Sequence, residues 1–344
     1  MLVVTAHAPM DLRVETRPDP GEPGPGQVRV RMAAGGICGS DLHYYRHGGW
    51  GTVRLREPMI LGHEVAGHVD AVGAGVEGLA PGDLVAVSPS RPCGGCRYCL
   101  EGTPNHCENM RFYGSAMPFP HIQGAFREVL IADAAQCVPA GDLSPAEAAM
   151  GEPLAVCLHA TRQAGPLLGK SVLVTGCGPI GVLSILAARR AGADRIVATD
   201  LSLFCLEMAR KAGADEVVDV SADPDGLSRF AAGKGTFDCL YECSGAEPAL
   251  RAAILAMRPR GVVVQLGLGG DMTLPMQAIT SKELELRGSF RFHEEFATGV
   301  SLMRKGLIDV SPFISETRPA SDAVAAFEAA GDRSRILKAQ LAFG

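Results

Sequence analysis

Short apolar runs separated by Gly and Pro dominate the chain up to about residue 145. Runs of this length, bounded by turn residues, are typical of β-strands. The strands expected in this part span residues 28–37, 63–73, 83–90 and 125–138. The pattern therefore predicts a mostly β region on the N-terminal side of the chain.

From about residue 146 the pattern changes to an alternation of strands and helices. A helical stretch over 144–165 begins at Ser144 followed by Pro145, a pair typical of a helix N-terminus. Apolar strands are expected at 171–176, 194–200, 215–220, 237–245 and 261–268, with helices at 179–191, at 203–213 and through Met257. Such alternation indicates a parallel, doubly wound sheet.

The C-terminal part returns to a strand-rich pattern, with strands expected at 284–292 and 336–343 around two short helical stretches. Because this texture resembles the N-terminal region, we expect the tail to complete that first domain. The predicted fold class is α/β. One domain is expected over 1–147, completed by 286–344, and a dinucleotide-binding domain over 148–285.

A G-x-G-x-x-G motif follows the first strand of the doubly wound region, at Gly176, Gly178 and Gly181. Its glycines allow a tight turn, close approach of the backbone to a pyrophosphate, and packing of helix on strand. Asp200 ends the next strand, where a carboxylate hydrogen-bonds the ribose hydroxyls and repels a 2′-phosphate. The motif predicts a site for NAD in preference to NADP. The alternative is a packing turn beside a solvated aspartate.

Four cysteines lie on one short segment with the spacing C-x2-C-x2-C-x7-C. They are Cys93, Cys96, Cys99 and Cys107. Four thiolates on a short loop close a tetrahedral zinc sphere and leave no open position, so a structural zinc site is predicted. The alternatives are four unrelated thiols or a zinc ribbon that binds nucleic acid.

The composition argues against the alternative in which the chain binds nucleic acid. With 38 acidic against 32 basic residues the net charge is −6, so no basic field attracts nucleic acid or an anionic membrane surface. The first ten residues carry no secretory signal pattern, and the uncharged run 171–188 is interrupted by glycines. Eleven cysteines in such a chain indicate metal ligands or free thiols, and the expected location is the cytoplasm.

Further metal-ligand types occur in three separate segments: Cys38 in GICGSDLH, His63 and Glu64 in GHE, and Glu152 in GEP. Taken singly, each has an ordinary interpretation as a buried thiol, a hydrogen-bonded histidine or a solvated carboxylate. Together they form a Cys, His and carboxylate set that leaves one position for a substrate oxygen, which is typical of a catalytic zinc.

The motifs, taken together, resemble the zinc-dependent medium-chain dehydrogenase/reductase superfamily along nearly the whole chain. The resemblance is carried by the Cys38 segment, by GHEVAGHVDAVG from Gly62, by the four-cysteine loop and by GCGPIG with Asp200. The segment from Cys38 to Tyr45 looks like the polyol dehydrogenase branch, and so do Glu152-Pro and RGSFRF. The resemblance implies a GroES-like, mostly β catalytic domain and a Rossmann cofactor domain.

The resemblance also implies two zinc ions per chain, one of them structural on the cysteine quartet. The catalytic zinc is implied on Cys38, His63, Glu64 and Glu152. Ser40 and His43 match the proton relay of the superfamily, and Glu152 is implied to reach the metal directly or through its water.

Cofactor and substrate contacts follow from the same resemblance. The implied cofactor residues are Gly176, Gly178, Pro179, Ile180, Gly181, Asp200, Cys243, Leu266, Gly267, Leu268, Ser289 and Arg291. Tyr44, Phe112 and Arg291 correspond to substrate contacts. The chain departs from the family at Cys205, where a basic residue is common five positions after the ribose aspartate.

The implied activity is the reversible, zinc-dependent oxidation of a secondary alcohol of a sugar acid, L-idonate to 5-keto-D-gluconate, with NAD as hydride acceptor. Arg291 is the first candidate for the substrate carboxylate because a guanidinium binds a carboxylate bidentately, and Arg111, Arg46 and His47 are weaker candidates. A neutral polyol is the alternative substrate. A catalytically dead zinc- and dinucleotide-binding protein is the non-enzyme alternative. The expected partner is a small molecule, neither nucleic acid nor membrane, in a homotetramer or else a dimer.

Overall fold

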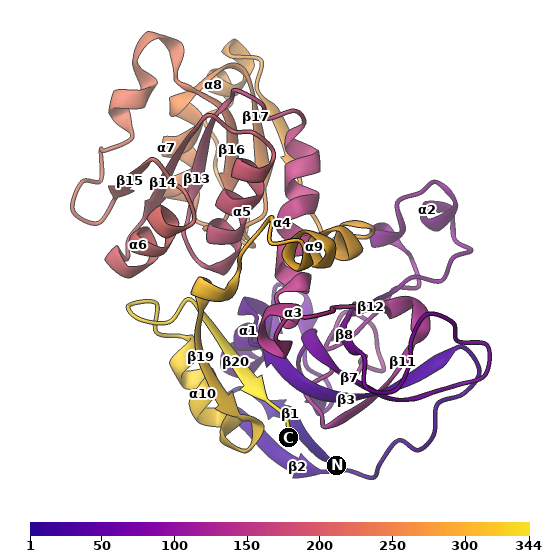
Figure 1. Ribbon diagram of the computed structural model, residues 1–344. Helices are drawn as coiled ribbons and strands as arrows, with labels where there is room; N and C mark the ends of the chain where they lie inside the picture. The colour runs from indigo at the N-terminus through magenta and orange to yellow at the C-terminus, as the bar shows by residue number, and fades with distance from the viewer. The chain divides into compact units, whose positions relative to one another are not determined.

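The computed structural model describes residues 1–344 and divides into two compact units (Figure 1). Unit 1 comprises Met1–Glu152, Phe296–Asp332 and Lys338–Gly344. Unit 2 comprises Pro153–Glu295 and Arg333–Leu337. The C-terminal part of the chain therefore contributes to both units.

Unit 2 is built on a six-stranded parallel sheet in the order β15-β14-β13-β16-β17-β18. Its strands are β13 (Ser171–Thr175), β14 (Arg195–Asp200), β15 (Glu216–Asp219), β16 (Phe237–Glu242), β17 (Met257–Gln265) and β18 (Glu285–Gly288). From β13 the chain first adds strands on one side and then, with β16, on the other. This change of direction between β13 and β16 is the topological switch point of a doubly wound sheet, and it confirms the predicted fold class.

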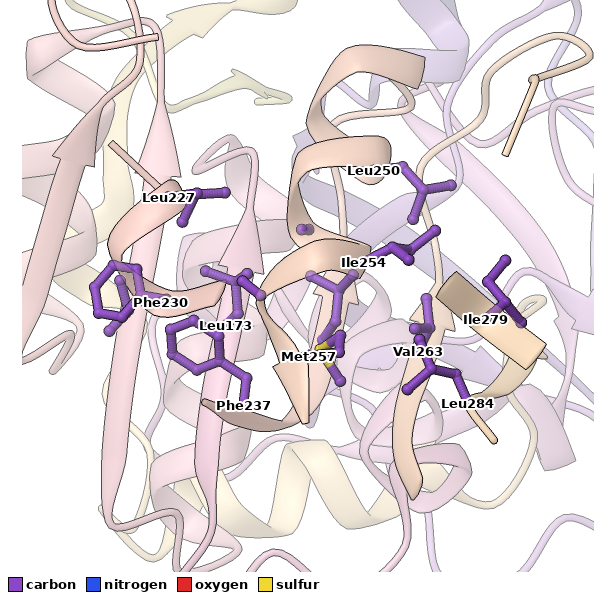
Figure 2. Close-up of a cluster of buried hydrophobic side chains, with 14 of the residues drawn as sticks. Leu173, Leu227, Phe230, Phe237, Leu250, Ile254, Met257, Val263, Ile279 and Leu284 are labelled. Atoms are coloured by element: carbon purple, nitrogen blue, oxygen red, sulfur yellow. The ribbon is translucent and has the colours of Figure 1, made fainter. Parts of the chain in front are cut away.

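Helices connect these strands and cover the sheet. They are α4 (Gly151–Ala164), α5 (Pro179–Arg190), α6 (Leu203–Lys211), the 3₁₀ helix η3 (Ser228–Lys234), α7 (Glu247–Ala256) and α8 (Met276–Ser281). Figure 2 shows a core cluster in which Ile254 of α7, Phe237 of β16 and Met257 of β17 are completely buried. Leu250 and Ile254 are four positions apart and so share the inward face of α7. Truncating a buried aromatic such as Phe237 to alanine costs about 3–5 kcal/mol.

Two sequence-based boundaries differ from the structure. The helix predicted over 144–165 is two helices, α3 (Pro145–Ala149) and α4, separated at Met150. Pro153 explains the break, because proline lacks a backbone N–H and its ring clashes with the carbonyl four residues earlier in a continuous helix. The strand predicted over 284–292 ends at Gly288. Arg291 beyond it has φ +56°, which lies outside the strand region.

Unit 1 contains a seven-stranded sheet in the order β12-β8-β7-β3-β20-β19, with β11 also paired to β3. Its strands are β3 (Gln27–Gly36), β7 (Glu64–Val72), β8 (Leu84–Val87), β11 (Val129–Asp133), β12 (Cys137–Pro139), β19 (Ile314–Pro319) and β20 (Lys338–Ala342). The C-terminal strand β20 pairs antiparallel with β3, with Gln340 opposite Gly36. The tail of the chain therefore completes a sheet that the N-terminal region begins.

Smaller elements surround this sheet. A three-stranded sheet joins β1 (Leu2–Ala8), β2 (Asp11–Thr16) and β6 (Met59–Ile60), and two-stranded pairs join β4 (Gly49–Trp50) to β5 (Val53–Arg54) and β9 (Ser90–Arg91) to β10 (Arg111–Phe112). The remaining helices are α1 (Gly39–His47), α2 (Arg97–Leu100), η1 (Pro104–His106), η2 (Ala134–Gln136), α9 (Glu295–Arg304), η4 (Ser311–Phe313), η5 (Ala320–Asp322) and α10 (Ala323–Ala330). No helix of the protein combines the length and apolar character that crossing a membrane requires.

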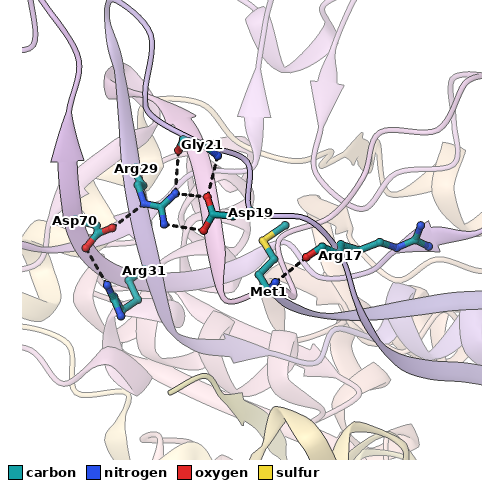
Figure 3. A network of polar contacts seen from close by, with 7 residues as sticks. All are labelled: Met1, Arg17, Asp19, Gly21, Arg29, Arg31 and Asp70. Atoms are coloured by element: carbon teal, nitrogen blue, oxygen red, sulfur yellow. Dashed lines mark hydrogen bonds and ion pairs between the residues drawn. The ribbon is translucent and has the colours of Figure 1, made fainter.

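A polar network holds the segment after β2 against the large sheet of unit 1 (Figure 3). Arg29 of β3 donates to Asp70 of β7 at 2.7 Å and to Asp19 at 2.6 and 2.8 Å. Arg31 adds a second contact to Asp70 at 3.0 Å. The hydrogen bonds from Arg29 hold the pKa of the Asp19 carboxyl well below its usual range. Because Asp19 is half exposed, solvent screens this pair and limits its contribution to stability.

Candidate active site and metal centres

The cysteine quartet lies on a loop of unit 1 with little hydrophobic support of its own. No residue of the short helix α2 within this loop is buried. Yet the sulfur atoms of Cys93, Cys96, Cys99 and Cys107 all lie within 4.8 Å of one another. Four soft donors at this separation suit one tetrahedral zinc ion with no position left open. The arrangement therefore fits a metal that organises the loop.

Hydrogen-bond donors around the quartet favour the thiolate form of Cys93. The N–H of Gly95 and the side chain of Asn109 lower the pKa of Cys93 to about 6. The N–H of Cys93 in turn donates to the sulfur of Cys107 at 3.2 Å. Desolvation and the neighbouring sulfurs raise the pKa of Cys99 to about 12 in the metal-free chain. A bound cation removes that penalty because it stabilises the negative charge of the thiolate.

A second cluster of metal-ligand types, Cys38, His63 and Glu64, lies elsewhere in unit 1. One ligand atom from each side chain lies within 4.8 Å of the others. Cys38 is the N-cap of α1, Glu64 is the first residue of β7, and His63 directly precedes that strand. His63 and Glu64 are 5% and 1% exposed. The sequence-predicted ligands thus meet where a helix start and a strand start come together.

Asp41 connects the two backbone segments of this cluster, and we did not assign it a role from the sequence. Its fully buried carboxylate accepts from the N–H of Cys38 at 3.1 Å and from the N–H of Gly62 at 3.2 Å. Its Oδ1 atom lies 3.7 Å from Nδ1 of His63. Burial raises the pKa of Asp41. Burial by itself lowers the pKa of His63, but Asp41 and Cys38 outweigh it and raise that pKa well above its usual value.

Lys338 is a further residue that the sequence did not point to. Its Nζ donates to both carboxylate oxygens of Glu64, at 2.8 and 2.7 Å, and to the carbonyl of Ile37 at 3.3 Å. Lys338 is 2% exposed, so the pair is buried. A Cβ on Gly36 would lie 2.0 Å from Oε2 of Glu64. The glycine at this position therefore makes room for the carboxylate.

Glu152 lies outside the three-residue cluster but belongs to its electrostatic surroundings. It is the second residue of α4 and is 5% exposed. Burial raises its pKa to about 7, while His63 opposes that rise. A buried carboxyl group that titrates near neutrality is suited to hold or release a proton.

Of the residues expected around the substrate, Tyr44 and Phe112 lie on α1 and β10 of unit 1, whereas Arg291 lies in unit 2. Tyr44 is 1% exposed, its hydroxyl accepts from the N–H of Ala116 at 3.0 Å, and its ring centroid lies 4.9 Å from that of Trp50. The ring of Phe112 lies 5.6 Å from that of His63. Ser40 and His43 both lie on α1, and partial burial lowers the pKa of His43.

The glycine motif of unit 2 has the geometry that its spacing predicts. Gly176 has φ +82°, and a Cβ there would lie 2.8 Å from backbone atoms of Ser244. A Cβ on Gly181 would lie 1.9 Å from the carbonyl oxygen of Gly176. Gly178 is the N-cap of α5, so the free N–H groups of that helix start directly after it. The loop therefore brings bare backbone to a helix N-terminus, as phosphate binding requires.

Asp200 braces this loop at the end of β14. Its carboxylate accepts from the N–H of Cys177 at 2.6 Å and from the N–H of Ser202 at 2.8 Å. Where the family often has a basic residue, Cys205 is buried and its sulfur lies 3.6 Å from the carbonyl oxygen of Arg333. The segment beginning at Arg333 therefore packs beside the position expected for the adenosine ribose.

The other expected cofactor residues follow β16, β17 and β18 of unit 2. They are Cys243, Leu266, Gly267, Leu268, Ser289 and Arg291. The N–H of Ser289 donates to the carbonyl of Gln265 at 3.0 Å. Leu268 is 65% exposed, and the Arg291 guanidinium lies 4.8 Å from the ring of Phe290. These residues therefore share the edge at which the parallel strands end.

Two family models match the chain. Residues 24–142 match the alcohol dehydrogenase GroES-like domain and residues 179–305 match the zinc-binding dehydrogenase family. The chain is 44% identical over 322 residues to L-idonate 5-dehydrogenase (NAD(P)(+)) of Escherichia coli strain K12, covering 91% of each chain. It is 37% identical over 334 residues to human sorbitol dehydrogenase, covering 95% of this chain and 92% of that one.

A solved structure extends this similarity to the whole fold. The crystal structure of L-idonate 5-dehydrogenase from Escherichia coli K-12 superimposes with a TM-score of 0.94 at 40% identity, covering 99% of this chain and 98% of the other. Sequence, family models and fold therefore agree, and the chain belongs to the zinc-dependent medium-chain dehydrogenase/reductase superfamily.

Proposed function

We propose that this protein oxidises a secondary alcohol of a sugar acid, L-idonate to 5-keto-D-gluconate, with NAD as hydride acceptor in a reversible reaction. The observation that carries this proposal is the set of half-buried Cys38 and buried His63 and Glu64, whose ligand atoms lie within 4.8 Å of one another. The similarity to L-idonate 5-dehydrogenase supports the sugar acid. The similarity to sorbitol dehydrogenase supports a neutral polyol as the second candidate substrate.

Two zinc ions per chain are proposed, and the donor sets fit them. The quartet of thiols would hold a structural ion, and Cys38, His63 and Glu64, with Glu152 directly or through water, would hold the catalytic one. When bound there, zinc acts as a Lewis acid on the alcohol oxygen and lowers its pKa. Lys338 contacts both oxygens of Glu64, so this carboxylate would ligate a metal through lone pairs that the lysine leaves unused.

The proton from the substrate hydroxyl is proposed to move through residues of α1. Ser40 would be the first group of this relay and His43 the last. Partial burial lowers the pKa of His43, which keeps its ring neutral and able to accept a proton near pH 7. Tyr44 and Phe112 would border the substrate, and Arg291 would bind its carboxylate.

NAD is proposed over NADP because of Asp200. The carboxylate at the end of β14 would accept from ribose hydroxyls and repel a 2′-phosphate. The motif residues Gly176, Gly178, Pro179, Ile180 and Gly181 would receive the pyrophosphate. The remainder of the cofactor would lie beside three turns. These contain Cys243, then Leu266, Gly267 and Leu268, and then Ser289 and Arg291.

Organisation and location complete the proposal. We propose a catalytic domain over 1–147 completed by 286–344, a cofactor domain over 148–285, and a homotetramer in the cytoplasm. The proposed partner is a small molecule, in line with the net charge of −6, which provides no basic field for nucleic acid or a membrane surface.

The test is the initial rate of NADH formation from NAD with L-idonate, measured beside sorbitol at equal concentration. A much higher rate with L-idonate supports the sugar-acid proposal, whereas a higher rate with sorbitol overturns it and leaves the neutral polyol. Cys38→Ala serves as the matched variant, with zinc content measured alongside. Full activity in that variant would contradict the role assigned to the buried cluster.

A further inference from the structure

Glu242 is a buried carboxylate that none of the proposed roles uses. It is the last residue of β16, and it is 0% exposed. Burying a charge is costly unless the group is paired or fully hydrogen-bonded, so such a residue needs a physical reason.

The surroundings of Glu242 consist of uncharged donors. Its Oε1 accepts from the N–H of Ser244 at 2.9 Å, from the N–H of Gly245 at 3.1 Å and from Oγ1 of Thr175 at 3.4 Å. The hydroxyl of Ser244 also donates to this oxygen. Its Oε2 accepts from the same N–H of Gly245 at 3.1 Å and from Nε2 of Gln265 at 2.6 Å. The two N–H groups can only donate, and the NH₂ of Gln265 is held in place because it also donates to the carbonyl of Gly267 at 2.9 Å, so this cradle fits a carboxylate better than a neutral amide.

These partners come from three strand ends. Thr175 ends β13 and directly precedes Gly176 of the glycine motif, Glu242 ends β16, and Gln265 ends β17. The contact between Thr175 and Glu242 therefore crosses the switch point between β13 and β16. In open parallel sheets, ligands bind outside the carboxyl ends of the strands at that point.

Close backbone packing couples the positions of these three strand ends. A Cβ on Gly176 would lie 2.8 Å from Ser244, and a Cβ on Gly267 would lie 2.2 Å from the nitrogen of Gly245. The backbone carbonyl of Glu242 also accepts from the N–H groups of Leu266 and Gly267, at 2.9 and 2.8 Å. A shift of the turn after β16 would therefore displace both the glycine motif and the turn after β17.

The turn after β17 also borders open space. Gln265 and Gly267 line a cavity of about 420 Å³ in unit 2, together with Gly288 at the end of β18. In a doubly wound fold the first three strands receive one nucleotide half and the second three receive the other. Because Asp200 and the glycine motif lie on the first half, Glu242 begins the half that faces the nicotinamide.

We propose that Glu242 is a positioning residue of the dinucleotide site, which fixes the three strand-end turns and whose negative charge favours the oxidised cofactor over the reduced one. The inference rests on the proposed use of NAD. The oxidised nicotinamide ring carries a positive charge that the incoming hydride neutralises. A buried carboxylate on that side of the sheet attracts the oxidised ring and has no such attraction for the reduced one.

Binding experiments with the zinc-loaded protein and no substrate test this inference. NADH is titrated by its fluorescence, and NAD by its displacement of NADH. Glu242→Gln keeps the size of the side chain but removes the charge and places an NH₂ group against donors. We expect it to weaken both cofactors by about tenfold or more, and NAD by about threefold more than NADH. Glu242→Asp keeps the charge at a shorter reach, so it should weaken both cofactors by equal factors.

Ile254→Val is the matched control, because it removes one methyl group from the core of unit 2 without touching the strand ends. It should lower the thermal midpoint and leave both affinities unchanged. Equal affinities of wild type and Glu242→Gln for both cofactors would overturn the inference, as would an equal loss for NAD and NADH in that variant. If the wild-type protein itself bound neither NAD nor NADH, the proposed cofactor would fail, and this inference with it.

Discussion

Lys338→Met tests whether the buried lysine compensates the charge of the Glu64 carboxylate, which lies beside Cys38 and His63. Methionine keeps the length of the side chain but removes the ammonium group that contacts Glu64 at 2.8 and 2.7 Å. The two side chains are 2% and 1% exposed, so solvent screening does not reduce the effect. Breaking a buried ion pair by removing one partner costs about 3–5 kcal/mol, because it leaves an uncompensated charge.

On another side, the Glu64 carboxylate lies against the backbone of β3, which offers it no positive charge. Oε2 of Glu64 lies so close to the backbone of Gly36 that a Cβ there would be 2.0 Å away. We therefore expect the metal-stripped variant to lose about 3–5 kcal/mol in the free energy of unfolding. The double variant Glu64→Gln/Lys338→Met buries no charge at this pair and should recover most of that loss.

Denaturant titration monitored by tryptophan fluorescence measures this loss in the relevant unit. The chain has one tryptophan, Trp50, and it lies in unit 1 with the ion pair. The signal therefore reports the unfolding of unit 1. A loss below about 1 kcal/mol in Lys338→Met, or a double variant less stable than the single one, would refute the argument from charge burial.

Three further predictions address the quartet, the pH response and the cofactor. Cys96→Ser should lower the zinc content by one ion per chain, measured by metal analysis, and lower the thermal midpoint, measured by calorimetry. An unchanged zinc content would show that the quartet holds no metal. Burial raises the pKa of Glu295, but hydrogen bonds from His159 and from backbone N–H groups, together with the charge of His159, outweigh burial and lower that pKa from 4.5 to about 2. Its contribution to stability is therefore complete above pH 4.5 and is lost as the pH falls toward 2, on the order of 3 kcal/mol in all. The free energy of unfolding of wild type and of Glu295→Gln can be followed by circular dichroism. The difference between the two proteins should shrink as the pH falls over that range, and a constant difference would contradict the role of Glu295. Asp200→Ala should weaken NAD about 10–100-fold, because charge-assisted hydrogen bonds are lost, while NADP binding weakens less; equal losses in titrations with both cofactors would argue against the ribose contact.

The features that were predictable from the sequence are those that depend on residues close together along the chain. Alternating strands and helices predicted the doubly wound sheet, because the two elements bury apolar residues with different periods. The glycines at 176, 178 and 181 predicted a tight turn at a helix start, because their spacing occurs between an expected strand and an expected helix. Pro153 even contained the signal for the break between α3 and α4, since proline fits the first turn of a helix but disrupts a helix that runs through it.

The fold class and the two sets of metal-ligand types can be inferred from the order of residues, whereas the charges that meet around them depend on how distant segments fold together. Lys338 contacts Glu64 across 274 positions, because β20 returns to pair with β3. Glu242 meets Thr175 and Gln265 only because parallel strands end at one edge of the sheet. Electrostatic partners act through space and leave no period or spacing in the chain, so they become visible only when the fold brings them together.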